Sequence, residues 1–79
     1  ELMFMDYFGV SHDALYNQAA KFLYMFGGKA RAPLVMRWMI GAGFSAAAQH
    51  TQSPYNIIAT TPGLKLVVPS TPYDVKALL

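Results

Sequence analysis

The sequence predicts an α/β fold: a parallel sheet with alternating strands and helices. Three short apolar runs, at residues 2–7, 34–40 and 64–68, have the length and composition of buried strands. A segment with helix signals follows each run, which gives the order strand–helix–strand–helix–strand–helix. This order implies parallel strands joined by right-handed crossovers. No linker or internal repeat interrupts it, so residues 1–79 belong to one domain.

The first helix is predicted between Ser11 and the Gly27-Gly28 pair. Ser11 has the residue type of an N-cap, and Asp13 in the first turn suits the helix dipole. The two glycines are a typical stop signal. An apolar stripe at helical spacing fills the segment between them: Leu15, Ala19, Phe22, Leu23 and Phe26.

The second and third strands each lead into a further helix. Residues 34–40 form a near-continuous apolar run, which is typical of a parallel strand covered on both faces. A short helix is predicted over residues 52–60, with Pro54 in its first turn. After the third strand, Thr71 is the expected N-cap, and Pro72 and Asp74 complete a helix-start signal.

Composition indicates a chain that buries surface against other chains. It is 54% hydrophobic and 13% charged, against about 25% charged in a typical soluble domain. It has no cysteine, which excludes disulfides and fits a reducing compartment. We therefore expect a homo-oligomer or a segment of something larger. Six scattered basic residues argue against nucleic-acid binding, and no metal-ligand spacing is present.

Neither a membrane span nor a targeting segment is expected. The longest apolar run, residues 34–48, contains Arg37 and is shorter than the roughly 20 residues that a membrane helix needs. The chain begins with Glu1 and lacks a basic region before an apolar stretch. Leu79 falls within a predicted helix, so we expect residues 1–79 to be a domain truncated at both ends.

The carboxyl ends of parallel strands form the ligand-binding edge of such sheets. This rule brings Asp6 and Tyr7 together with the loop that runs from residues 41–43 to His50. Tyr7 can stack on a ligand ring or be plain core. His50 can donate a proton near neutral pH or be a histidine hydrogen-bonded for structure. The Gly-Ala-Gly stretch is a cofactor-facing loop or simply a turn, and His12 is expected to be a solvated surface group.

Five stretches in register carry a resemblance to a known family. The chain is similar to the beta subunit of thiamine-diphosphate-dependent 2-oxoacid dehydrogenases of the pyruvate, acetoin and branched-chain types. The stretches are Glu-Leu-Met-Phe-Met-Asp-Tyr (1–7), Asn-Gln-Ala-Ala-Lys (17–21), Tyr-Met-Phe-Gly-Gly-Lys (24–29), Gly-Ala-Gly-Phe-Ser-Ala-Ala-Ala-Gln-His-Thr-Gln-Ser (41–53) and Pro-Gly-Leu-Lys-Leu-Val-Val-Pro-Ser-Thr-Pro-Tyr-Asp-Val-Lys (62–76).

The resemblance implies a partial transketolase-like pyrimidine-binding domain with thiamine diphosphate as the cofactor of the parent enzyme. That enzyme decarboxylates a 2-oxoacid and passes the acyl group to lipoate. Tyr7 matches the family's pyrimidine-contacting phenylalanine, and His50 matches its active-site histidine. The implied partners are an alpha subunit, a second beta subunit and the lipoyl acyltransferase core. The implied location is the bacterial cytoplasm rather than the mitochondrial matrix.

Some positions depart from the family pattern. The family's cofactor-activating glutamate lies upstream of the segment that Glu1 begins, and its diphosphate-metal motif belongs to the alpha subunit. Thr60 stands where relatives commonly carry His, and Pro54 with residues 56–58 replaces a more aromatic stretch. We therefore expect the isolated chain to be inactive. Residues 37–43 and 50–58 favour the acetoin type. A non-enzymatic self-associating α/β module and a small-ligand binding module are the alternatives.

Overall fold

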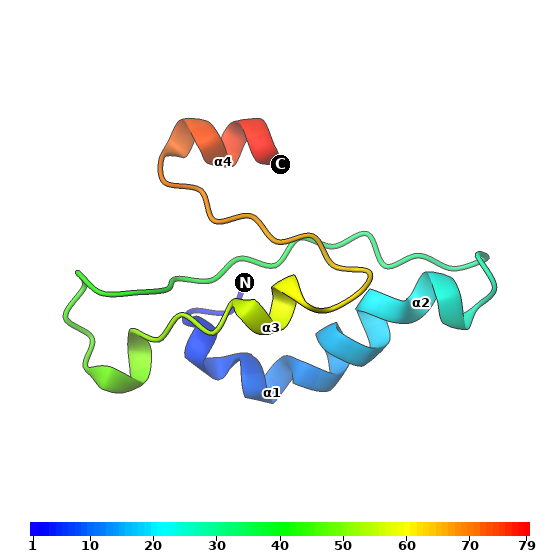
Figure 1. The fold of residues 1–79 in the computed structure, drawn as a ribbon, viewed down its shortest axis with the longest axis horizontal. Coiled ribbons are helices and arrows are strands. Elements are labelled where there is room, and N and C mark those ends of the chain that lie inside the picture. The colour runs from blue at the N-terminus through cyan, green and yellow to red at the C-terminus, as the bar shows by residue number, and fades with distance from the viewer.

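The computed structural model describes all residues from 1 to 79 and is built from short helices and long extended segments (Figure 1). A continuous helical run follows residue 5, and α4 lies apart from α1, α2 and α3, beyond the extended chain. No helix is long and apolar enough to span a bilayer. The elements are η1 (Met5–Tyr7), α1 (Phe8–His12), η2 (Asp13–Ala19), α2 (Ala20–Met25), η3 (Ala48–His50), α3 (Asn56–Ala59) and α4 (Pro72–Leu78).

The first two predicted strands pair in parallel, but only over a few residues. Phe4 and Met39 form an isolated parallel bridge. The backbone N–H groups of Leu2 and Met5 donate to the carbonyls of Arg37 and Met39, both at 3.1 Å. The first extended segment then ends earlier than predicted, because the chain turns into the 3-10 helix η1 at Met5. The predicted parallel pairing of the first two segments is present. The predicted strand over residues 2–7 is wrong at its carboxyl end, where η1 begins.

The third predicted strand is extended but does not join a sheet. Leu64 N–H donates to Thr61 in the preceding turn, and no backbone hydrogen bond links residues 64–68 to residues 34–40. A hollow of about 790 Å³ lies between these two segments and extends to Val75 and Leu78 of α4. A three-stranded sheet therefore stays a prediction beyond the single bridge.

The first α-helix begins three residues before the expected N-cap. Phe8 is the first residue of α1, and Ser11 lies inside the run, where its hydroxyl donates to the Phe8 carbonyl at 3.3 Å. Asp13 begins the π-helical stretch η2 instead of occupying a first turn. The predicted stop is confirmed. Gly27 and Gly28 have φ of 58° and 82°, and Gly28 N–H donates a hydrogen bond to the Leu23 carbonyl.

The two C-terminal helices differ in how well sequence signals placed them. The helix expected over residues 52–60 is reduced to α3, Asn56–Ala59, and Pro54 lies in the turn before it rather than in its first turn. The last helix starts as predicted. The Thr71 side chain accepts from Asp74 N–H, and the Asp74 carboxylate accepts from Thr71 N–H.

A small hydrophobic core lies between the helical run and the extended segments. It consists of Met5, Phe8, Leu15 and Ile58, of which Met5 is 1% exposed. The extended segments contribute alternate residues to it, as strands do: Met36, Trp38, Ile40, Leu64 and Leu66.

The outer face of the second extended segment is open, which corrects the expectation of a strand covered on both faces. Val35 is 65% exposed and Met39 is 49% exposed. The radius of gyration is 13.9 Å, against roughly 12 Å expected for a compact chain of this length. The chain alone thus leaves one layer of its expected architecture uncovered.

Candidate functional site

The carboxyl ends of the first two extended segments meet, as the parallel arrangement requires. Asp6 and Tyr7 lie in η1, directly after the first segment. The loop after the second segment leads to η3, which carries His50 and packs against η1. The two candidate site residues, Tyr7 and His50, are therefore neighbours in space although 43 positions separate them in the sequence.

Three rings form a cluster at this edge. The His50 imidazole stacks on Phe4, with ring centroids 4.7 Å apart and planes 18° apart. The Tyr7 ring meets His50 edge-on at 5.5 Å and 81°. Phe4 is buried at 7% exposure, whereas Tyr7 is 40% exposed. The cluster thus has a buried floor and an open aromatic edge, an arrangement that suits a planar ligand.

One nitrogen of His50 has no partner within the chain. Its Nδ1 atom is buried and makes no hydrogen bond. Buried polar atoms in folded proteins are nearly always bonded, so an orphaned one calls for an explanation. An imidazole nitrogen beside an open aromatic edge can donate or accept a proton for a bound ligand. The structure shows no hydrogen bond at this nitrogen that would hold His50 for structure alone, and its functional role stays a prediction.

The sequence pattern did not single out the contact that holds this edge together. Asp6 Oδ1 accepts hydrogen bonds from the backbone N–H of Gln52, at 3.2 Å, and from its side-chain Nε2, at 2.7 Å. Asp6 Oδ2 is buried without a partner. Asp6 stood at the predicted edge, but no spacing rule pairs its carboxylate with the amide of Gln52, 46 positions away.

The loop that carries His50 has an uncommon backbone. Gly41 and Gly43 have φ of 78° and 110°, and the non-glycine residues Ser45 and Ala47 have φ of 60° and 64°. Left-handed conformations cost energy for residues with a Cβ atom, and they persist where the surroundings enforce them. Within the chain, a Cβ on Gly43 would meet nothing within 4 Å. The left-handed φ of both glycines fits a turn, and a cofactor-facing role of this stretch stays a prediction.

The residues that follow the third extended segment take part in the start of α4. Ser70 and Thr71 both hydrogen-bond to the Asp74 carboxylate at the start of α4. These bonds, from Thr71 and then Ser70, hold the pKa of Asp74 below its ordinary value. Residues 69–71 thus lead into the cap of α4. None of their hydrogen bonds reaches the ring cluster.

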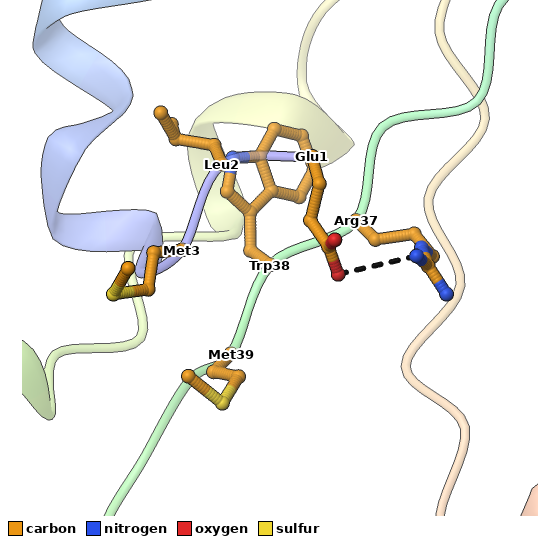
Figure 2. Close-up of a pocket in the computed structure, with 6 residues that line it drawn as sticks. All are labelled: Glu1, Leu2, Met3, Arg37, Trp38 and Met39. Carbon is orange, nitrogen blue, oxygen red and sulfur yellow. Dashed lines mark ion pairs between the residues drawn. The ribbon is translucent and has the colours of Figure 1, made fainter.

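A second hollow, of about 430 Å³, lies at the start of the paired segments and not at their carboxyl ends (Figure 2). Arg37 and Glu1 form an ion pair of 3.2 Å beside it, and both side chains are largely exposed. The Trp38 indole lies between Leu2 and this pair in the view. Exposed ion pairs contribute little to stability, so this hollow has no strong electrostatic feature.

The second histidine differs from its expected role as a solvated group. His12 lies within the helical run, where it stacks on Tyr16 at 4.6 Å and meets Phe8 edge-on at 5.2 Å. It is half-buried because the helix starts earlier than the sequence pattern indicated. No group of three or more His, Cys, Asp or Glu side chains is arranged to hold a metal ion.

The comparisons with known proteins identify the family of the chain. The family described as transketolase, pyrimidine binding domain matches residues 1–79. The chain is 62% identical over 79 residues to the acetoin:2,6-dichlorophenolindophenol oxidoreductase subunit beta of Cupriavidus necator, and 60% identical to the Bacillus subtilis protein of that name. It is 40% identical to the 2-oxoisovalerate dehydrogenase subunit beta of Bacillus subtilis.

These matches cover 100% of the chain but only 23%, 23% and 24% of the three relatives. No solved structure matches the chain. Pyrimidine-binding domains of this family have an α/β fold, and the bridge between Phe4 and Met39 is the part of a parallel sheet that this chain shows. The chain belongs to the transketolase pyrimidine-binding domain family.

Proposed function

We propose that residues 1–79 are the cofactor-facing part of the pyrimidine-binding domain in the beta subunit of a thiamine-diphosphate-dependent 2-oxoacid dehydrogenase of the acetoin type. The observation that carries this proposal is the contact between Tyr7 and His50 at the carboxyl edge of the paired segments. The resemblance of the sequence assigns these two residues to the cofactor, and they meet at the edge where α/β domains bind ligands.

The residues present fit one end of thiamine diphosphate. The half-exposed Tyr7 ring offers an aromatic surface to the planar aminopyrimidine, and the unpartnered Nδ1 of His50 offers a hydrogen-bonding atom. Residues 1–79 contain no cluster suited to the metal ion that accompanies the diphosphate. We assign the pyrimidine end to this chain and the diphosphate end to another subunit.

Each residue of the cluster has a separate task in this account. When bound, the cofactor supplies a nucleophilic carbon that attacks the carbonyl carbon of the substrate. Tyr7 packs against the pyrimidine and excludes water from it. His50 holds or donates a proton at its imidazole during acyl transfer to lipoate. Phe4, stacked beneath His50, fixes the plane of the imidazole.

The proposed partners follow from the relatives and from the open surfaces. The relatives are named as beta subunits, and we propose an alpha subunit, a second beta subunit and a lipoyl acyltransferase core as partners in the bacterial cytoplasm. In the assembled protein, residues 64–68 would complete the parallel sheet beside residues 34–40. Pairing of these two segments would close the hollow of about 790 Å³ that lies between them and would cover apolar surface.

Calorimetric titration with thiamine diphosphate and Mg²⁺ tests the proposal on the full-length protein with its alpha partner. Saturable binding is expected, and Tyr7→Ala should weaken it by roughly tenfold because base–aromatic stacking contributes about 1–3 kcal/mol. Val10→Ala is the matched control, because Val10 is 91% exposed and lies outside the ring cluster. Equal affinities in Tyr7→Ala and Val10→Ala would overturn the assignment of Tyr7.

The substrate class is tested by turnover in the same preparation. Reduction of dichlorophenolindophenol is measured with acetoin, pyruvate and 2-oxoisovalerate as competing substrates. We expect acetoin to give the highest kcat/KM and His50→Ala to lower acyl transfer to lipoate more than it changes cofactor affinity. A preference for 2-oxoisovalerate would contradict the acetoin assignment.

A further inference from the structure

We infer that Asp6 is a positioning residue: its carboxylate, through Gln52, sets the place of His50 relative to Tyr7. The inference rests on the proposed function only where it gives this geometry a role in the enzyme. The contact itself is a property of the chain and is measured without any cofactor.

The geometry is that of a clamp between two segments. One carboxylate oxygen, Oδ1, accepts from both the backbone and the side-chain nitrogen of Gln52. Hydrogen bonds to a charged acceptor are stronger than those between neutral groups. Because one of the two donors is the backbone N–H, the carboxylate fixes the path of the main chain and not only a side chain.

The clamp is the only hydrogen-bonded tie between the His50 loop and the rest of the molecule. Within residues 41–53, the other hydrogen bonds are local: His50 N–H and the Thr51 hydroxyl both donate to the Ala47 carbonyl. The two bonds from Gln52 to Asp6 are the ones that leave the loop. Without them, only ring contacts would hold His50 against η1.

The backbone of this loop needs such a tie. Ser45 and Ala47 both have left-handed φ, and two left-handed glycines precede them. Conformations of this kind persist only where surrounding contacts enforce them. Gln52 follows His50 by two positions, so a bond at Gln52 restrains the chain at the point where it leaves η3.

The position of Asp6 makes the clamp specific to the site. Asp6 directly precedes Tyr7 within η1. One carboxylate therefore restrains both halves of the Tyr7–His50 pair: Tyr7 through the covalent chain and His50 through Gln52. The buried atoms left without partners here are Asp6 Oδ2 and His50 Nδ1, so the clamp uses one carboxylate oxygen and makes no bond to the imidazole.

The ring-current shifts of the His50 protons report the stacking on Phe4 and provide the first readout. We compare the wild type with Asp6→Ala, Asp6→Asn and Asp13→Ala in the 79-residue chain with labelled histidine. Asp13 is the matched control, because it also accepts hydrogen bonds from two side chains, Asn17 and Gln18, but stands in η2. The only other histidine, His12, serves as an internal reference.

Asp6→Ala should move the His50 proton shifts towards free-histidine values and leave those of His12 unchanged. It should also speed exchange of the Gln52 backbone N–H by roughly tenfold, the effect of losing a bond to a charged acceptor. Asp6→Asn retains an acceptor oxygen and should restore the wild-type shifts, and Asp13→Ala should leave them in place. Wild-type His50 shifts in Asp6→Ala would overturn the inference.

A covalent test remains decisive if Asp6→Ala fails to fold. The chain has no cysteine, so Asp6→Cys with Gln52→Cys introduces the only pair of thiols. This pair should form an intramolecular disulfide that keeps the His50 stacking signature, and Asp13→Cys with Gln52→Cys should not close. Failure of the 6–52 pair to oxidise, or loss of the stacking signature once it has, would contradict the clamp.

The outcome for the clamp is separable from the outcome for cofactor binding. In the assembled enzyme, Asp6→Ala should lower acyl transfer to lipoate by roughly tenfold, more than it changes thiamine diphosphate affinity, because a displaced His50 loses a bond-held position, and Asp6→Asn should restore the transfer. If the wild-type protein binds no cofactor, the proposed function fails while the His50 shifts still decide the clamp. If the cofactor binds to both proteins and acyl transfer is equal in wild type and Asp6→Ala, the proposed function stands and the positioning role is refuted.

Discussion

The N-terminal core and the C-terminal arm of the chain are ordered by different forces. We define the core as Met5, Phe8, Leu15 and Ile58, and the arm as residues 64–79. The core residues are at most 5% exposed, whereas α4 in the arm contains no buried residue. α4 nevertheless has the best-capped start in the chain.

The comparison separates what starts a helix from what holds it in place. Thr71 and Asp74 define the first turn of α4 through bonds within four residues. The run that follows η1 has no side-chain cap at all, yet it buries Phe8 and Leu15. Capping sets the boundary of a helix, and burial of apolar area anchors it to the rest of the molecule.

The largest expected effect lies in the core. Met5→Ala should lower the free energy of unfolding by about 2–5 kcal/mol, because it leaves a cavity at the most buried side chain. Val10→Ala removes apolar atoms that are already in water and should change stability little. Denaturant unfolding measures both, and equal losses would show that the core does not hold the N-terminal region.

Substitution of Gly63, which joins the core to the arm, should have the second-largest effect on stability. Its φ is 93°, and a Cβ there would run into the backbone of Ala20, 2.9 Å from its carbonyl carbon. Gly63→Ala should therefore cost about 2–4 kcal/mol, from the left-handed backbone and the clash together. Gly28→Ala has a similar φ but open space around it and should cost only about 1 kcal/mol. Similar melting temperatures for the two variants would refute this close approach.

The cap of α4 should have a smaller and more local effect. Thr71→Ala should lower the local stability of α4 by about 1 kcal/mol, because Asp74 N–H loses its acceptor. Thr71→Ser keeps the hydroxyl and should behave like the wild type. Amide exchange within α4 gives the measurement, with the core amides as reference. An unchanged α4 in Thr71→Ala would mean that tertiary contacts hold this helix.

The smallest expected effect is the pH dependence of the arm. Hydrogen bonds from Thr71 and Ser70 lower the pKa of Asp74. A carboxyl whose folded pKa is depressed stabilises the folded state above its unfolded pKa of about 3.9, and this contribution is lost as pH falls through the lower folded pKa. Helicity of α4 should therefore fall in that acidic range, and Asp74→Asn should flatten the profile. An unchanged α4 profile in Asp74→Asn would contradict this origin of the pH dependence.

Local signals in the sequence were sufficient for the elements that depend on a few neighbouring residues. The Gly27-Gly28 stop and the Thr71 cap form where they were predicted. The start of the first helix was misplaced at Ser11, because burial of Phe8 outweighed a suitable capping residue. The third strand lacked its sheet partner, which depends on contacts between distant segments and not on the composition of residues 64–68.

The candidate site could be located from the sequence, but the reason for its shape could not. The rule for parallel strands placed Tyr7 and His50 at one edge, and the rings do meet there. The bonds between Asp6 and Gln52 depend on where a left-handed loop directs one amide. No periodicity in the sequence encodes that direction, so the contact emerged only from the three-dimensional arrangement.

The most direct test of the account follows the ring signals of Tyr7 and His50 by NMR while thiamine diphosphate and Mg²⁺ are added to the protein. The account predicts that both signals move saturably with one dissociation constant, and that Tyr24 and Tyr73, which are exposed and outside the ring cluster, stay in place. Saturable shifts at Tyr24 or Tyr73 with Tyr7 and His50 unmoved would contradict the placement of the cofactor at this edge.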